Sequence, residues 1–194
     1  MCHFPITGVY WAMMGHGCGG GPDEALAARA REGCKTCLSG LYERYRHAVA
    51  RYVFEAYVRT FDVALDIEDE VWKKVVEHIG GWTGQRPFRA WLFAIARNHA
   101  LNVLRHERRA PEAVPALEVP GPLEALTSAE SRAAAVRLVR ALPEELREVF
   151  VLRVVFDLAP AALAEMFDVP VSTVRGRLFR ARKLLTEGVS HDVR

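Results

Sequence analysis

Apolar residues between positions 38 and 110 recur at steps of three and four, which is the spacing of one buried face of an α-helix. The clearest series has apolar residues one turn apart from Ile67 to Ile79 and stops at the pair Gly80-Gly81, because glycine commonly ends helices. The pattern predicts a helical segment from residue 38 with a buried stripe over residues 41–52, helices over residues 63–79 and 88–105, and a shorter helix over residues 23–31.

The C-terminal third shows the same periodicity after a change in composition. Residues 110–126 contain four prolines, three glutamates and no basic residue, which is typical of an extended linker. Helical spacing then predicts helices over residues 129–141, 144–156, 160–167 and 171–185. No segment has the strict alternation of a strand. We therefore expect an all-α protein with two small helical domains joined by a flexible Pro-rich linker.

The expected domains follow from these changes in pattern. The chain divides into a Cys- and Gly-rich N-terminal extension (1–37), a first helical domain (38–110), a linker (111–130), a second helical domain (131–187) and a tail (188–194).

The last two predicted helices have the features of a helix-turn-helix. Asp168-Val169-Pro170 forms a short turn between them, and Asp tolerates the left-handed backbone that such a turn needs. The small side chain of Ala164 lets the two helices cross closely. The apolar stripe of the second helix comprises Val174, Leu178, Ala181 and Leu185.

Charge is segregated along the chain, although the net charge is only +2. Residues 62–70 hold five acidic and no basic side chains, whereas residues 171–183 hold five basic and no acidic ones. A basic outer helix face can enter the major groove, where arginine binds guanine or phosphate. The alternative is a basic face that is simply solvated. The candidate DNA-binding residues of this helix are Ser172, Thr173, Arg175, Gly176, Arg177, Phe179, Arg180 and Lys183.

Two blocks of the chain resemble a known family. Residues 142–185, and above all VPVSTVRGRLFRARKLL, resemble the fourth conserved region of sigma factors of the extracytoplasmic-function group. Residues 41–109 resemble the second region through the segments LYERYRHAV, DIEDEVWKKV and FRAWLFAIARNHALNVLRHERR. The resemblance implies a promoter-specific transcription initiation factor. Its second-region domain would bind core RNA polymerase and the melted −10 element, and its fourth-region domain would bind the −35 element as duplex.

The resemblance assigns roles within the first domain. Asp66, Asp69 and Glu70 match the positions that face the polymerase, although the family commonly has Gln where this chain has Asp69. Without the resemblance, an exposed acidic face would be the simpler interpretation. Binding of a single strand needs aromatic surfaces, amides and cations. The −10 candidates are the loop residues Trp82 and Arg86, and a helical stripe of Trp91, Asn98, Asn102 and Arg105. For Trp91, packing in the core is an equally good interpretation.

The linker length is compatible with such a role. Its 20 residues (111–130) reach roughly 66 Å when fully extended. Promoter elements two helical turns apart are separated by roughly 70 Å, and the domains add their own width. The implied partners are core RNA polymerase and promoter DNA. An anti-sigma factor is a further expectation, because family members are often held inactive by one.

The four cysteines all lie within the first 37 residues, so no disulfide could cross-link the rest of the chain. This distribution favours a protein of the reducing cytoplasm. His16, Cys18, Cys34 and Cys37 form a candidate zinc set. Redox sensing and plain reduced cysteines are the alternatives, and no cofactor is otherwise expected. No run of about 18 apolar residues predicts a membrane span, and we recognise no signal peptide.

Two other functions compete with the leading one. The first is a helix-turn-helix transcriptional regulator that does not associate with core polymerase. The second is an enzyme, a metal-dependent nuclease or hydrolase that uses the Cys/His cluster. The chain contains no Walker loop, H-E-x-x-H motif or nucleophile elbow, so we expect no catalysis.

Overall fold

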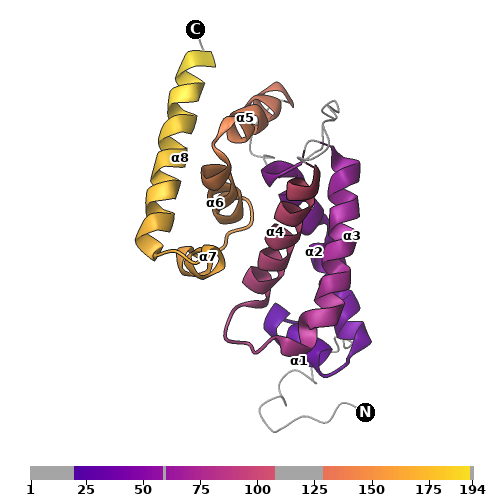
Figure 1. Ribbon diagram of the computed structural model, residues 1–194. Helices are drawn as coiled ribbons and strands as arrows, with labels where there is room; N and C mark the ends of the chain where they lie inside the picture. The colour runs from indigo at the N-terminus through magenta and orange to yellow at the C-terminus, as the bar shows by residue number, and fades with distance from the viewer. Residues whose placement is uncertain (1–19, 59, 108–128, 193–194) are drawn as a thin grey trace.

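The computed structural model describes residues 20–58, 60–107 and 129–192, with side chains described over 20–58, 60–105 and 134–187. Every regular element within these ranges is a helix, which confirms the predicted all-α class (Figure 1). The helices are α1 (Asp23–Arg31), α2 (Lys35–Ala56), α3 (Phe61–His78), α4 (Phe88–Glu107), α5 (Ala129–Ala141), α6 (Glu144–Val154), α7 (Pro160–Phe167) and α8 (Val171–Asp192), with one 3-10 turn, η2 (Ile79–Gly81).

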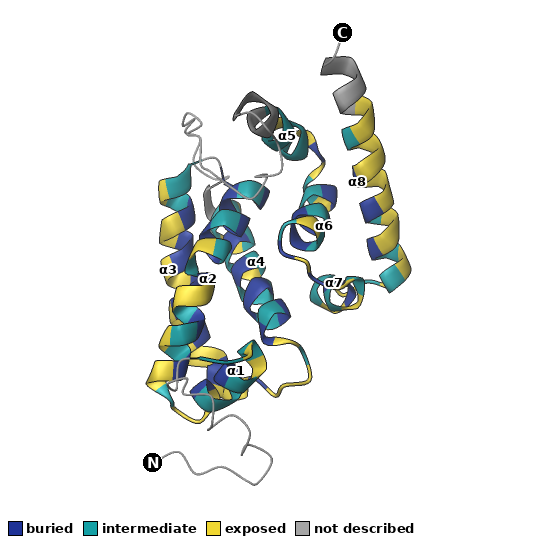
Figure 2. Ribbon diagram, turned by 180° about the vertical axis from the view of Figure 1, so that it is seen from behind, coloured by how far each residue is buried: buried dark blue, intermediate teal, exposed yellow. Residues whose placement is uncertain are grey.

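Helices α1–α4 form an N-terminal bundle, in which α3 and α4 pack on the long helix α2. The predicted stripe of α3 is buried, with Ile67, Val71 and Val75 at most 3% exposed. On α3 the buried residues lie along one side of the helix and the exposed residues along the other (Figure 2). Helix α1 lies across the end of the bundle, where Asp23 accepts hydrogen bonds from Arg44 and Tyr45 of α2.

Helices α5–α8 form a C-terminal bundle that contains the predicted helix-turn-helix. Asp168 ends α7 in the left-handed conformation (φ 52°, ψ 51°), as the turn requires. The amide of Val169 then donates to the carbonyl of Ala164 at 3.0 Å. Leu163 of α7 and Val174 of α8 are fully buried, so the two helices share one small core.

The two bundles pack against each other, which the sequence did not predict. One apolar cluster includes buried residues of both. Phe156, which follows α6, contacts Phe93 of α4 and Tyr52 of α2, with ring centroids 4.8 and 6.0 Å apart. The predicted linker lies almost entirely outside the described residues. The structure is therefore a closed arrangement of two helical bundles, in which α6 and α7 separate α8 from α4 (Figure 1).

Candidate DNA and polymerase interfaces

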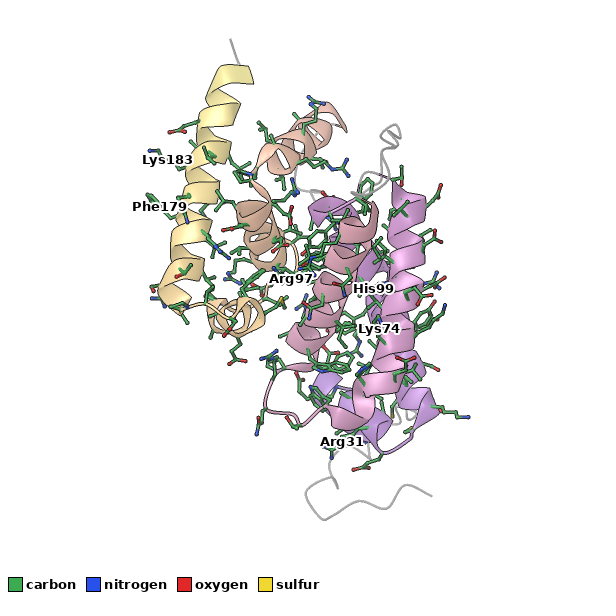
Figure 3. All side chains as sticks on the ribbon, viewed as in Figure 1. Arg31, Lys74, Arg97, His99, Phe179 and Lys183 are labelled. Atoms are coloured by element: carbon green, nitrogen blue, oxygen red, sulfur yellow. The ribbon has the colours of Figure 1, made fainter. Side chains whose placement is uncertain are left out.

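The outer face of α8 is open to solvent over the length of the predicted contact stripe. Val174, Leu178 and Ala181 point into the C-terminal bundle and are at most 6% exposed. Phe179 is 70% exposed, an unusual position for a large aromatic side chain, and projects away from the molecule beside Lys183 (Figure 3). The exposed members of the predicted set are Ser172, Arg175, Gly176, Phe179, Arg180 and Lys183.

Two predicted members of this set are less accessible. Thr173 is half-buried. The side chain of Arg177 is only 16% exposed and pairs with Glu145 of α6 at 2.9 Å. Arg177 therefore ties α8 to α6, whereas Arg175 and Arg180 project outward from the same helix.

The loop between α3 and α4 forms a half-open pocket of about 390 Å³. Trp82 is only 4% exposed, and its indole N–H donates to the carbonyl of Arg86 at 3.1 Å. The loop is thereby folded back on itself, and the Trp82 ring also meets Phe88 edge-on. Trp91 is half-buried beside Phe88, with ring centroids 5.7 Å apart. The pocket is lined by Gly81, Trp82, Thr83, Gln85, Arg86, Trp91 and Glu165.

Glu165 reaches this pocket from α7 of the other bundle. Its carboxylate oxygen Oε2 lies 3.2 Å from Nε of Arg86, and its side chain is 58% exposed. Glu165 is not among the residues predicted from the sequence, because an exposed glutamate on a short helix has no distinguishing spacing.

The remaining −10 candidates follow the pocket along α4. Asn98, Asn102 and Arg105 are exposed, and Arg105 donates to the Asn102 side-chain carbonyl at 3.0 Å. A second cavity, of about 290 Å³, opens beside Arg105 between α4 and α6. The structure thus groups Trp82, Arg86 and Trp91 in one pocket and places the amides and Arg105 farther along the helix.

The acidic candidates lie on the outer side of α3. Asp66, Asp69 and Glu70 are all exposed, and Glu70 pairs with Lys73 at 2.5 Å. The hydrogen bond and positive charge of Lys73 hold the pKa of Glu70 below its usual range. A further acidic residue of this segment, Glu68, is instead buried, and burial raises its pKa.

A buried acidic residue that is not among those predicted from the sequence connects the bundles. Glu148 of α6 is 3% exposed. It accepts a hydrogen bond from the Tyr57 hydroxyl at 2.6 Å and lies 3.3 Å from Nε of Arg97 on α4. Burial raises the pKa of Glu148, while Tyr57 and Arg97 oppose that shift. The only signal in the sequence was its position one turn before the apolar Leu152.

The cysteine pair begins α2. Cys34 is the residue before its first turn and is half-buried, whereas Cys37 is fully buried. The hydrogen bond from Cys37 lowers the pKa of Cys34, and burial raises that of Cys37 to about 11. The other two residues of the candidate zinc set, His16 and Cys18, lie outside the described residues. Within the part of the chain that the structure describes, no three metal-binding side chains come together.

None of the helices in the described ranges is long and apolar enough to cross a membrane.

Comparison with known proteins decides the family. The sigma-70 region 2 family model matches residues 41–110, and the sigma-70 region 4 family model matches residues 132–185. The ECF RNA polymerase sigma-E factor of Escherichia coli K12 is 32% identical over 186 residues, which cover 89% of this chain and 96% of that protein. The chain is an extracytoplasmic-function sigma factor of the sigma-70 family. The resemblance inferred from its residues is confirmed.

Other matches support the assignment of this sigma factor. The sigma-E factor of Haemophilus influenzae is 31% identical over 84% of this chain and 93% of its own length. The structure of CnrH in complex with the cytosolic domain of CnrY has a TM-score of 0.67 and 26% identity, over 88% of this chain and 98% of that one. The sigma factor RpoE of Bartonella quintana, in complex with the anti-sigma factor NepR, shares the fold with a TM-score of 0.67 and 16% identity, over 78% of this chain and 96% of that one. Its family makes this sigma factor a promoter-specific transcription initiation factor.

Proposed function

We propose that this sigma factor divides promoter recognition between its two bundles, with the chain divided as the sequence predicts, at residues 38–110 and 131–187. The observation that carries the proposal is an exposed face with several basic residues on one bundle and a pocket with aromatic side chains and an arginine on the other. The first suits duplex DNA, and the second suits an unpaired strand.

Helix α8 binds the −35 element in the major groove. Arg175 and Arg180 are placed to reach guanine edges or phosphates, and Phe179 offers an apolar surface to a thymine methyl group. Arg177 contributes mainly by fixing α8 through Glu145. Gly176 allows DNA to approach the backbone of α8 closely, because it has no side chain and no other atom lies within 4 Å of the point where a Cβ would stand.

The pocket at the α3–α4 loop binds the melted −10 strand. Trp91 supplies a stacking surface and Arg86 a cation for phosphate, as single-strand sites require. Asn98, Asn102 and Arg105 would follow the strand along α4. Trp82 shapes the pocket wall rather than offering a free ring, because its indole is buried and hydrogen-bonded.

The acidic face of α3 binds core RNA polymerase. Asp66, Asp69 and Glu70 supply exposed negative charge for a basic partner surface. The site of action is the cytoplasm, with no catalytic step and no cofactor. An anti-sigma factor is a further expected partner, since the similar structures of CnrH and RpoE are complexes with CnrY and NepR.

Run-off transcription with purified core polymerase and a promoter library tests the proposal. Charge reversal at Asp66 and Glu70 (Asp66→Lys, Glu70→Lys) should abolish transcription and co-migration with core polymerase, while duplex binding by α8 persists. The matched control is Glu43→Lys on the exposed side of α2. Full transcription by the doubly reversed protein would contradict the assignment of α3. DNA binding without any association with core polymerase would favour the regulator instead.

A further inference from the structure

One wall of the pocket proposed for the −10 strand is formed by an acidic group of the same chain. Glu165 lines it together with Trp82 and Trp91, and its carboxylate pairs with Arg86 at 3.2 Å. An arginine that would bind a DNA phosphate is thus bound by a carboxylate, which presents the same negative oxygen atoms in the same kind of pair.

Buried polar contacts hold α6 in the position that places Glu165. The carboxylate of Glu148 is shared between Tyr57 of the α2 end and Arg97 of α4. The guanidinium of Arg97, which projects toward the C-terminal bundle (Figure 3), also lies over the Phe167 ring of α7, 4.8 Å from its centroid. Arg147 of α6 donates to the carbonyl of Ala56 at 2.9 Å. Each contact joins the two bundles.

Apolar burial acts in the same direction. Phe156 is 5% exposed and inserts between Tyr52 and Phe93 of the N-terminal bundle. Burial of a phenylalanine removes a large apolar area from water, so separation of the bundles would expose this ring and its aromatic partners.

The closed arrangement is too small to bridge a promoter. A compact chain of 194 residues has a radius of gyration of roughly 16 Å and is therefore about 40 Å across. Two DNA elements two helical turns apart are separated by roughly 70 Å. The bundles must separate before α8 and the pocket can bind the same promoter.

We propose that the C-terminal bundle inhibits the N-terminal bundle within the free protein, with Glu165 standing in for a DNA phosphate at Arg86. Release of the contacts made by Glu148, Arg147 and Phe156 separates the bundles and opens the pocket. This inference rests on the proposed role of the pocket in binding the −10 strand.

The first test neutralises the competing carboxylate in the full-length protein. Glu165→Gln removes the charge from an exposed position, so the fold is retained. Its affinity for a random-sequence single-stranded 15-mer, measured by fluorescence anisotropy, should rise about threefold to fivefold, since exposed ion pairs are weak. The control Asp157→Asn makes the same charge change on an exposed carboxylate that pairs with Arg153 within its own bundle. Equal affinities for Glu165→Gln, Asp157→Asn and the unchanged protein would overturn the role of Glu165.

The second test opens the closed state itself. Glu148→Lys places a cation beside Arg97 in a buried site, which strongly disfavours closure. Small-angle X-ray scattering should show a larger radius of gyration, and single-strand affinity should rise at least tenfold relative to the Asp157→Lys control. Circular dichroism verifies that both variants remain helical. Opening without a gain in affinity would overturn the inhibition, because the C-terminal bundle would then not block the pocket.

These results are separable from the proposed function. If the affinity and the radius change as expected but core polymerase never transcribes with any of the proteins, the inhibition stands and the assignment as an initiation factor on these promoters fails. If transcription proceeds but neither variant changes affinity or radius, the internal inhibition is wrong.

Discussion

The outer face of α8 and the pocket at the α3–α4 loop are both proposed to bind DNA, yet they are built in opposite ways. The α8 face is a regular helix surface whose contact residues already project into solvent. The pocket depends on a loop held by the indole hydrogen bond of Trp82 and by a hydrogen bond from Arg31 to the Trp82 carbonyl, and a carboxylate from another bundle lines it. With these proposed roles, the surface for duplex recognition is preformed, whereas strand capture requires a change in the arrangement of the bundles.

The largest expected effect comes from removing the side chain that shapes the pocket. Trp82→Ala should lower the free energy of unfolding by about 3–5 kcal/mol, because a buried Trp is replaced by a cavity and the hydrogen bond to Arg86 is lost. Thermal unfolding followed by circular dichroism measures this. The control is Val76→Ala, whose side chain is 57% exposed. A small effect would show that Trp82 is not part of the core.

The preformed face should respond through affinity and not through stability. If Arg175 contacts a base, Arg175→Ala should cost roughly 1–3 kcal/mol at one position of the −35 element. If Arg180 contacts a phosphate, Arg180→Ala should weaken binding to all sequences and reduce the salt slope by about one. Titration of duplex libraries at several salt concentrations distinguishes the two, with Arg153→Ala on α6 as the control. Unchanged selectivity and salt slope in both variants would exclude α8 as the reader.

Trp91 separates the two interpretations left open by the sequence. If it stacks on an unpaired base, Trp91→Leu should weaken single-strand binding by about 1–3 kcal/mol. The experiment is best made in the Glu148→Lys background, where the pocket is open. Duplex binding should not change. If Trp91→Leu lowers the free energy of unfolding as much as Trp82→Ala does but leaves the single-strand affinity unchanged, Trp91 is a core residue.

Phe179 should show the smallest effect. Because it is 70% exposed, Phe179→Ala should leave the free energy of unfolding within about 0.5 kcal/mol of the original value. Its loss should weaken binding only to duplexes with thymine at the contacted position. Replacement of that thymine by uracil, which lacks the methyl group, should give the same loss in the unchanged protein. A uniform loss across sequences would instead indicate a general packing role.

The helices could be predicted from the sequence because each buries one apolar stripe. The spacing of Ile67, Val71 and Val75 fixed the inward side of α3 and therefore its acidic outer side. The turn at Asp168 followed from the tolerance of Asp for a positive φ, which the structure has at 52°. These features depend on residues within one or two turns of each other.

Contacts between the bundles could not be predicted in this way. The polar contacts of Glu148 and Glu165 are with residues 51 to 91 positions away in the chain. Phe156 contacts aromatic rings on two different helices of the other bundle. Local periodicity contains no information on such pairings, and an acidic residue on a helix ordinarily predicts a solvated surface. The same limit explains why Trp82 was selected as a contact residue without its burial being foreseen.

Because the two bundles belong to one chain, weak contacts between them are sufficient to keep them together. Joining two surfaces in one chain makes their association intramolecular, with an effective concentration on the order of millimolar for short connections. The contacts of Glu148, Arg147 and Phe156 can then keep most of the population closed, and the exposed pair of Arg86 and Glu165 adds a smaller contribution. A competitor in solution would have to match that effective concentration, so nucleic acid at low concentration would rarely separate the bundles. A large partner that binds several surfaces simultaneously would separate them more effectively.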